Sequence, residues 1–406
     1  MPPNNCIYCN KSNSFSKEHV FPSGMGGNDT NFILYNSVCT DCNTTVFSPL
    51  EATLMRKSPF GLARMQNQPV GRQQGKRTKP PTFDTETCLV IEKNGDASEA
   101  YFTTGLRPII LPQIKILDQT IHVTSHDHCS LNIFYTDLEK LLDINVFTIS
   151  VKYQNTNKTF EISQYIWDGH CYTLESTIER ITPPAGIWLN TLTSSDSKCE
   201  EWPRIFRDPK GRIILRTAYS SEAAYFLSGV KRSLATLKNQ IEKAIEIEPT
   251  TSDNNLVYTK MSVDMRKTFR AICKIGVNFI CHEYGEEVAR EGALNPIKEF
   301  ILNGTGSFIP HPLKELEEVF SGDERKQHIA MLYPIPHGNS ILLAFVLQLY
   351  NGTIQTIGLG EFSKSSKIKN TPVIFLINYI DNKIERNEFS EYLRQRKSHS
   401  NDALTE

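Results

Sequence analysis

The chain has 406 residues, of which 39% are hydrophobic and 22% are charged, and its formal net charge is −1. This composition supports two or three folded domains and excludes wholesale disorder. A net charge near zero also excludes a chain that is basic throughout, so contact with nucleic acid would have to come from a local basic stretch.

The amino terminus, MPPNNC, lacks the charged and apolar regions of a secretory signal, and no apolar run reaches the roughly eighteen residues of a membrane span. We therefore expect a cytoplasmic protein with no membrane partner. In a reducing compartment the ten cysteines should not form disulfides. Two C-x-x-C pairs are typical of a metal site, and the other six cysteines are expected to be core thiols.

Residues 1–48 are rich in Cys, Asn, Ser and Gly and cannot bury a useful core, so this segment needs a staple. Ser48, Pro49 and Glu51 then predict a helix start, with Ser48 as N-cap and Glu51 completing a capping box, and the helix should run to about residue 57.

Residues 56–79 contain seven Lys or Arg and no Asp or Glu. A solvated linker would have this composition, but we favour an arm that contacts phosphate. The candidate nucleic-acid-binding residues are Arg56, Lys57, Arg64, Arg72, Lys76, Arg77 and Lys79.

From residue 83 the pattern alternates between strand-like and helix-like segments. Turn residues at 208–211 predict a hairpin over 205–217, and Asn351-Gly352 predicts a two-residue hairpin turn. The expected strands span 87–93, 100–104, 146–154, 160–165, 329–334, 340–350, 353–359 and 373–379, and the expected helices span 135–142, 221–245, 263–284 and 295–303.

We expect an α+β fold, with a small zinc-stabilised ββα-metal finger followed by a larger mixed α/β region. The predicted divisions are a metal-stabilised domain over 1–58, a basic linker or arm over 59–82, a mainly β region over 83–217, an α+β C-terminal domain over 218–385 and a polar tail over 386–406. We call residues 1–58 the finger.

The cysteine pairs Cys6/Cys9 and Cys39/Cys42 can supply four thiolates to one Zn²⁺ in tetrahedral geometry. Two separate redox dithiols are the alternative, but neither pair has a thioredoxin-like βαβ context. A site closed by four cysteines has no open position, so this zinc should be structural.

Between the cysteine pairs lie residues suited to phosphodiester hydrolysis, which needs an activated water and neutralised phosphate charge. His19 could be the base, and Glu18 could bind a hard cation such as Mg²⁺, which prefers oxygen ligands. Because strand neighbours point to opposite faces, both could serve one site only if the backbone bends there. The amides of Asn36 and Asn43 could complete the metal shell or orient the histidine.

The string C-x-x-C, Glu-His-Val-Phe-Pro, Gly-Gly, Asn-Ser-Val-C-x-x-C-Asn closely resembles the HNH endonuclease superfamily in its four-cysteine form, over about residues 6–57. The resemblance implies a β-hairpin and helix around one divalent ion. It implies that His19 is the general base, that Glu18 and Asn43 bind the catalytic ion, and that Asn36 orients His19.

Two departures affect the metal. Glu18 stands where Asp is more familiar, and Asn43 stands where the family name implies His. Oxygen ligands favour Mg²⁺ or Mn²⁺ over Ni²⁺ or Zn²⁺. Glu51 could be an additional ligand, although the capping box accounts for it.

The expected function is a metal-dependent endonuclease acting on DNA, with RNA left open, of restriction type or in bacterial antiviral defence. Residues 83–406 would then recognise DNA. One alternative is an effector nuclease whose C-terminal region senses a small-molecule activator. Another is a zinc finger that only binds nucleic acid. A homodimer also stays open.

Overall fold

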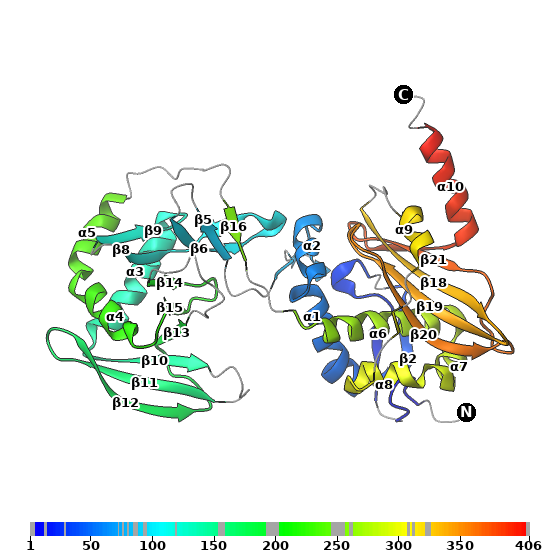
Figure 1. Cartoon of the computed structure of the whole chain (residues 1–406), viewed down its shortest axis with the longest axis horizontal. Coiled ribbons are helices and arrows are strands. Elements are labelled where there is room, and N and C mark those ends of the chain that lie inside the picture. The colour runs from blue at the N-terminus through cyan, green and yellow to red at the C-terminus, as the bar shows by residue number, and fades with distance from the viewer. Residues whose placement is uncertain are drawn as a thin grey trace. The chain divides into compact units, whose positions relative to one another are not determined.

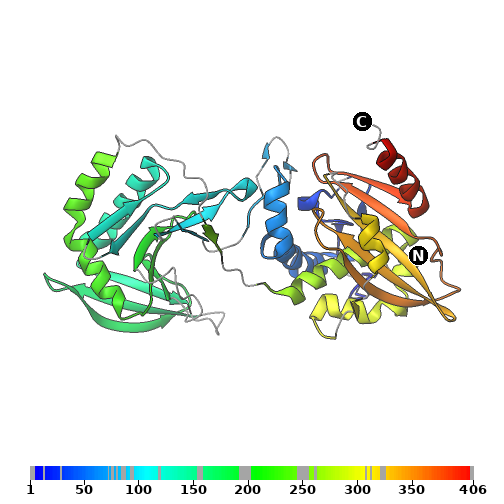
Figure 2. The same ribbon diagram turned by 45° about the horizontal axis from the view of Figure 1, so that its top comes forward.

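The chain divides into two units in the computed structural model, shown from two directions in Figures 1 and 2. Unit 1 comprises residues 1–84, 104–106 and 261–406, and unit 2 comprises residues 85–103 and 107–260. The structure describes residues 5–11, 14–27, 30–71, 73–74, 77–78, 81–83, 88–91, 96–117, 120–152, 159–191, 203–244, 256–259, 263–306, 309–310, 313–320 and 326–402.

These units differ from the predicted divisions in two ways. The finger and most of the predicted C-terminal domain belong to the same unit, unit 1. The segment after residue 217 belongs to unit 2, because helices α4 (Glu222–Arg232) and α5 (Leu234–Ala244) pack their apolar faces against its strands. The single helix expected there is interrupted at Ser233, which caps α4.

Unit 2 contains an eight-stranded sheet in the order β12-β11-β10-β13-β15-β14-β8-β9 and a four-stranded sheet in the order β16-β5-β6-β7. Helices α3, α4 and α5 share a core with the larger sheet. The predicted hairpin over 205–217 is present as β14 and β15. The bounds are β5 (Cys88–Ile91), β6 (Ala97–Phe102), β7 (Pro108–Ile110), β8 (Gln113–Leu117), β9 (Thr120–Thr124), α3 (His128–Asp143), β10 (Val146–Lys152), β11 (Phe160–Trp167), β12 (Tyr172–Arg180), β13 (Ile187–Thr191), β14 (Arg204–Arg207), β15 (Ile213–Thr217) and β16 (Leu256–Tyr258).

Unit 1 combines the finger with an antiparallel sheet in the order β17-β20-β19-β18-β21-β22. The finger and helices α6 and α8 pack on one face of this sheet, and α9 and α10 pack on the other. The bounds are β1 (Phe15–His19), β2 (Ile33–Cys39), α1 (Ser48–Arg56), α2 (Pro59–Asn67), β3 (Gln73–Gln74), β4 (Arg77–Thr78), α6 (Met265–Tyr284), α7 (Glu286–Ala289), α8 (Asn295–Asn303), β17 (Ile309–Pro310), α9 (Lys314–Phe320), β18 (Gln327–His337), β19 (Ser340–Gln348), β20 (Gln355–Ser363), β21 (Val373–Asn378), β22 (Lys383–Glu388) and α10 (Phe389–Asp402).

The first helix begins earlier than its capping pattern predicts. Ser48 has helical backbone angles and is preceded by a π-helical turn over Cys42–Phe47, so it is not an N-cap. Its backbone N–H donates five residues back, to Asn43 O. Pro49 has no N–H to donate, and such a widened turn accommodates it inside a continuous helix.

The predicted linker is partly helical. Ser58 caps α2 by accepting a hydrogen bond from the N–H of Gly61, and Pro59 occupies the first turn. The polar tail from residue 386 is predicted to begin with a helix, and α10 is present there up to Asp402; the strand β22, which enters the tail, was not predicted.

The predicted two-residue Asn-Gly hairpin turn is wrong, because the pairing of β19 with β20 ends at Leu347 and Gln355. Within this longer connection Gly352 N–H donates to the carbonyl of Leu349, and Tyr350 and Asn351 have positive φ.

One hydrophobic core joins the finger to the rest of unit 1. Phe21 and Phe47 of the finger belong to the same buried cluster as Phe279 of α6, Phe345 of β19 and Phe375 of β21. The finger is therefore a part of unit 1 and not a separate globule. None of the helices in the described part of the chain combines the length and apolar character needed to cross a membrane.

The finger's Gly26 approaches the sheet so closely that a side chain cannot fit. Its φ is +101°, and a Cβ built there would lie 2.7 Å from Cα of Tyr379. We expect Gly26→Ala to lower the free energy of unfolding by about 1–3 kcal/mol, measured by chemical denaturation, because it adds both backbone strain and overpacking. Gly292→Ala is the control, since a Cβ there meets only Asn295 at 3.8 Å. Equal stability of the two variants would contradict the close packing.

Candidate active site and metal centre

The four cysteines of the two C-x-x-C pairs meet at one point, as predicted. The Sγ atoms of Cys6, Cys9, Cys39 and Cys42 all lie within 4.8 Å of one another, and those of Cys9 and Cys39 are 3.6 Å apart. Thiolates bound about 2.3 Å from a tetrahedral zinc ion would be about 3.8 Å apart, so the cluster fits such an ion. Backbone N–H groups of Cys39 and Cys42 point at Sγ of Cys6 and Cys39, both at 3.4 Å, and would stabilise thiolate charge.

Strand β1 carries the two central residues of the motif on opposite faces. Glu18 pairs with Leu34 of β2 in the ladder and is 3% exposed, whereas His19 pairs with Ile33 and is half-buried. Lys17, on the same face as His19, is exposed. The alternation of a regular strand is therefore kept, and the backbone bend that would bring both residues to one face is absent from β1.

Glu18 points inward to helix α6. Its carboxylate forms an ion pair with Nζ of Lys274, and its Oε1 accepts a hydrogen bond of 3.0 Å from Nδ2 of Asn278. Lys274 also pairs with Oε1 of Glu51 at 2.6 Å. Burial raises the pKa of the Glu18 carboxyl, and Lys274 opposes this shift.

This placement does not fit the expectation that Glu18 is an accessible ligand of the catalytic ion. A hydrated divalent ion would have to reach a buried carboxylate that already faces an ammonium group. Glu51 is held by the same ammonium, and it does not serve the capping box predicted for Ser48.

Asn43 lies beside β1, on the π-helical turn that follows the last cysteine. Its Nδ2 donates to Oγ of Ser16 at 2.9 Å and to the carbonyl of Lys17 at 3.1 Å. Both bonds use the amide nitrogen, so the amide oxygen is the atom that could ligate an ion. Asn43 therefore fits the predicted ligand position better than Glu18 does.

Asn36 occupies a bulge in β2. Ser16 pairs with Val38 and Glu18 pairs with Leu34, so three residues of β2, 35–37, face the single residue Lys17. Asn36 has φ of +58° and is exposed, and Asn tolerates this left-handed conformation better than most residues. Asn36 stands opposite Lys17, which is two residues, or about 7 Å, along β1 from His19. The register therefore does not support the predicted role of Asn36 in orienting His19.

Only part of the predicted basic arm lies on the surface of the protein. Arg56 and Lys57 are exposed at the end of α1, as a phosphate contact requires. Arg64 is instead 6% exposed, and its Nε donates to the carbonyl of Gly24 at 2.9 Å inside unit 1, which corrects its predicted role. Arg77 lies in β4, and three residues lie outside the described part of the chain: Arg72, Lys76 and Lys79.

Sequence reasoning missed the residues of α6 that contact the finger. Lys274 and Asn278 lie four residues apart on one face of the helix, and both are fully buried. Asn278 donates to the carbonyl of His19 at 3.0 Å and accepts from the hydroxyl of Tyr8 at 2.7 Å. Two polar residues within an apolar helix face were the available signal, since a buried polar residue needs a partner.

Lys17 of β1 and Tyr35 of β2 are two further exposed residues, and they contact each other. The Nζ of Lys17 lies 5.5 Å from the centroid of the Tyr35 ring, and Tyr35 is 52% exposed because it follows the buried Leu34 in β2 and so faces outward. A cation next to an aromatic ring suits a phosphate and a base.

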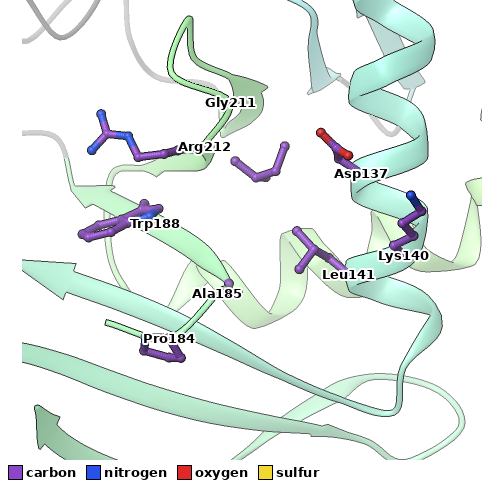
Figure 3. A pocket seen from close by; sticks show the side chains of 10 residues that line it. Asp137, Lys140, Leu141, Pro184, Ala185, Trp188, Gly211 and Arg212 are labelled. Carbon is purple, nitrogen blue, oxygen red and sulfur yellow. The ribbon is translucent and has the colours of Figure 1, made fainter. Parts of the chain in front are cut away.

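Unit 2 contains a separate pocket of about 410 Å³ between α3 and the strands β13 and β15 (Figure 3). Its size is in the range of small-ligand sites. Two of its charged groups have partners: Asp137 pairs with Arg207 at 2.9 Å, and Arg212 pairs with Asp208 at 2.7 Å and lies over the Trp188 ring. Lys140 of α3 also lines the pocket and is exposed. The lining therefore does not select one class of ligand.

We expect Cys39→Ser to release the metal, because a tetrahedral thiolate site loses one of its four ligands. Plasma mass spectrometry of the purified full chain should show about one zinc ion in the wild type and little in the variant. The midpoint of thermal unfolding should also fall, because metal-binding energy is folding energy.

Cys129→Ser is the control for this experiment, since Cys129 is exposed on α3. Full retention of metal by the Cys39 variant would contradict the four-cysteine site.

Comparison with known protein families gives a match that falls on this site. A family model described as HNH endonuclease matches residues 6–58, which include all four cysteines and the residues between them. Searches of curated proteins and of solved structures gave no match. The family match covers the finger alone, and within it the four cysteines are placed so that they could bind a metal ion.

Proposed function

We propose that the protein is a metal-dependent endonuclease that hydrolyses phosphodiester bonds in DNA. The single observation that carries this proposal is the position of His19, which stands on the outward face of β1 within the segment that matches the HNH endonuclease family. Zinc on the four cysteines would be structural, because all positions of that site are used by the chain.

In this proposal His19 accepts the proton of the attacking water, which is the usual role of a histidine near neutral pH. Mg²⁺ or Mn²⁺, when bound, would neutralise charge on the scissile phosphate. Asn43 would hold the ion through its amide oxygen, while its amide nitrogen keeps it against β1. The carbonyl of His19 accepts a hydrogen bond from Nδ2 of Asn278, which holds the backbone of the proposed base in place.

DNA is the proposed substrate because exposed basic residues lie close in sequence to the motif. Arg56 and Lys57 end α1, and Lys17 shares the outward face with His19. Cations on a surface attract the phosphate backbone whatever its sequence, so RNA would meet the same residues. Comparing cleavage of supercoiled DNA with cleavage of single-stranded RNA therefore decides the substrate class.

Unit 2 would select the substrate in a restriction-type or defence nuclease. The alternative, a sensor of a small-molecule activator, draws on the pocket between α3 and β13, whose volume suits a small ligand. Cleavage by the purified chain with no added small molecule would disfavour the sensor. A homodimer is tested by measuring the mass in solution.

We expect His19→Ala to lower the rate of Mg²⁺- or Mn²⁺-dependent nicking of supercoiled DNA by at least about 100-fold, because the general base is lost. DNA binding should be retained, which an electrophoretic shift assay measures. His122→Ala, an exposed histidine on β9, is the matched control. Full activity of His19→Ala would reject the mechanism, and absence of cleavage by the wild type with every divalent ion would favour a zinc finger that only binds.

The double variant Arg56→Ala with Lys57→Ala should bind DNA more weakly and leave the turnover at saturating DNA close to that of the wild type. For each phosphate that is no longer neutralised, the slope of log affinity against log salt concentration should fall by about 1. Arg64→Met provides the contrast: it should lower the unfolding midpoint and leave this slope unchanged, because its guanidinium bonds Gly24 inside unit 1. An unchanged slope in the double variant would remove both residues from the interface.

A further inference from the structure

We propose that Lys274 and Asn278 of α6 are positioning residues of the nuclease site, and that Glu18 is their anchor on β1 and not a ligand of the catalytic ion. The inference rests on the proposed nuclease function. It assigns to Glu18 a role that differs from the one its place in the motif implies.

The first argument is charge. Lys274 is fully buried, the side chain of Glu18 is 4% exposed, and the two are in direct contact. Lys274 also lies 2.6 Å from Oε1 of Glu51 and 5.4 Å from the centroid of the Phe47 ring. Removing one partner of a buried ion pair leaves an uncompensated charge, so these groups depend on one another. A divalent cation at Glu18 would be repelled by the ammonium that is already there.

The second argument is geometry. Asn278 bonds three groups of the finger: Oε1 of Glu18 at 3.0 Å, the carbonyl of His19 at 3.0 Å and the hydroxyl of Tyr8 at 2.7 Å. With Glu18 fixed inward and the next carbonyl held by the same amide, the alternation of β1 places the His19 side chain on the outward face. Tyr8 lies between the cysteines of the first pair, so Asn278 also ties the base to the metal-binding loop.

The third argument is the metal. Mg²⁺ keeps several waters and binds through one or two accessible oxygens. Glu18 offers a buried carboxylate that is already used by Lys274 and Asn278, whereas Asn43 lies at the half-buried edge of the finger. The proposed ion therefore belongs on the side of Asn43 and His19, and not on the side of Glu18.

The test uses the full chain with four variants: Glu18→Gln, Lys274→Met, the double variant of these two, and Asn278→Ala. Lys267→Met is the matched control, since Lys267 is an exposed lysine on the same helix. Three quantities are measured: the nicking rate as a function of Mn²⁺ concentration, Mn²⁺ binding by electron paramagnetic resonance, and hydrogen exchange of the β1 amides.

We expect Lys274→Met and Asn278→Ala to lower the maximal nicking rate by about 10- to 100-fold while the Mn²⁺ dissociation constant changes less than about threefold. The double variant should recover activity relative to Lys274→Met, because it leaves no unpaired buried carboxylate at position 18. Exchange of the β1 amides should accelerate in both single α6 variants. A role in global stability alone would accelerate exchange throughout unit 1 and would show no such recovery.

A rise of about tenfold or more in the Mn²⁺ dissociation constant of Glu18→Gln would overturn the proposal, because that is the loss expected for a ligand. The Mn²⁺ dissociation constant of Glu18→Gln distinguishes a ligand from an anchor even if Lys274→Met does not fold, since Gln preserves the shape of Glu. Wild-type activity of Asn278→Ala with unchanged β1 exchange would also overturn it. If the wild type neither cleaves nor binds Mn²⁺, the proposed function fails, and β1 exchange still decides whether α6 positions the strand.

Discussion

The ion pair between Lys274 and Glu18 is the interaction on which the arrangement of the finger depends. Two buried charges are tolerated only when each meets its partner with good geometry. The partners lie far apart in the chain, and Glu51 adds a second carboxylate to the same ammonium. The finger can bury the Glu18 carboxylate only because α6 supplies its counter-charge. The shared hydrophobic core is a second set of contacts between the finger and α6.

Two constraints of different range hold the finger in place. The cysteine cluster acts locally, joining the loop at Cys6 to the end of β2, and it compensates for a segment too short to bury much apolar surface. Helix α6 acts at long range, behind β1. What these constraints leave on the outward side is His19, with Asn43 and Lys17 beside it. The residues proposed for chemistry are thus neither members of the cysteine cluster nor partners of the Lys274 ammonium.

The sequence predicted the local parts of this arrangement well, because they depend on spacing. Two C-x-x-C pairs suffice to predict the metal site, and the helix at 295–303 was correctly bounded by Gly304. It could not predict partners that only the tertiary fold supplies. Asn278 and Glu18 are 260 residues apart. Arg64 lies in a basic segment whose composition predicts phosphate contacts. Only the tertiary structure shows that its guanidinium is buried and donates to the carbonyl of Gly24.

The same distinction explains why the motif alone assigned Glu18 to the metal. Two adjacent strand residues can serve one site only where the backbone departs from alternation. The finger does contain such a departure, but it lies in β2, where the three residues 35–37 face the single residue Lys17 of β1. In β1 burial still alternates between neighbours, so Glu18 and His19 face opposite ways. Once His19 faces outward, Glu18 must be buried, and a buried carboxylate requires the cation that α6 provides.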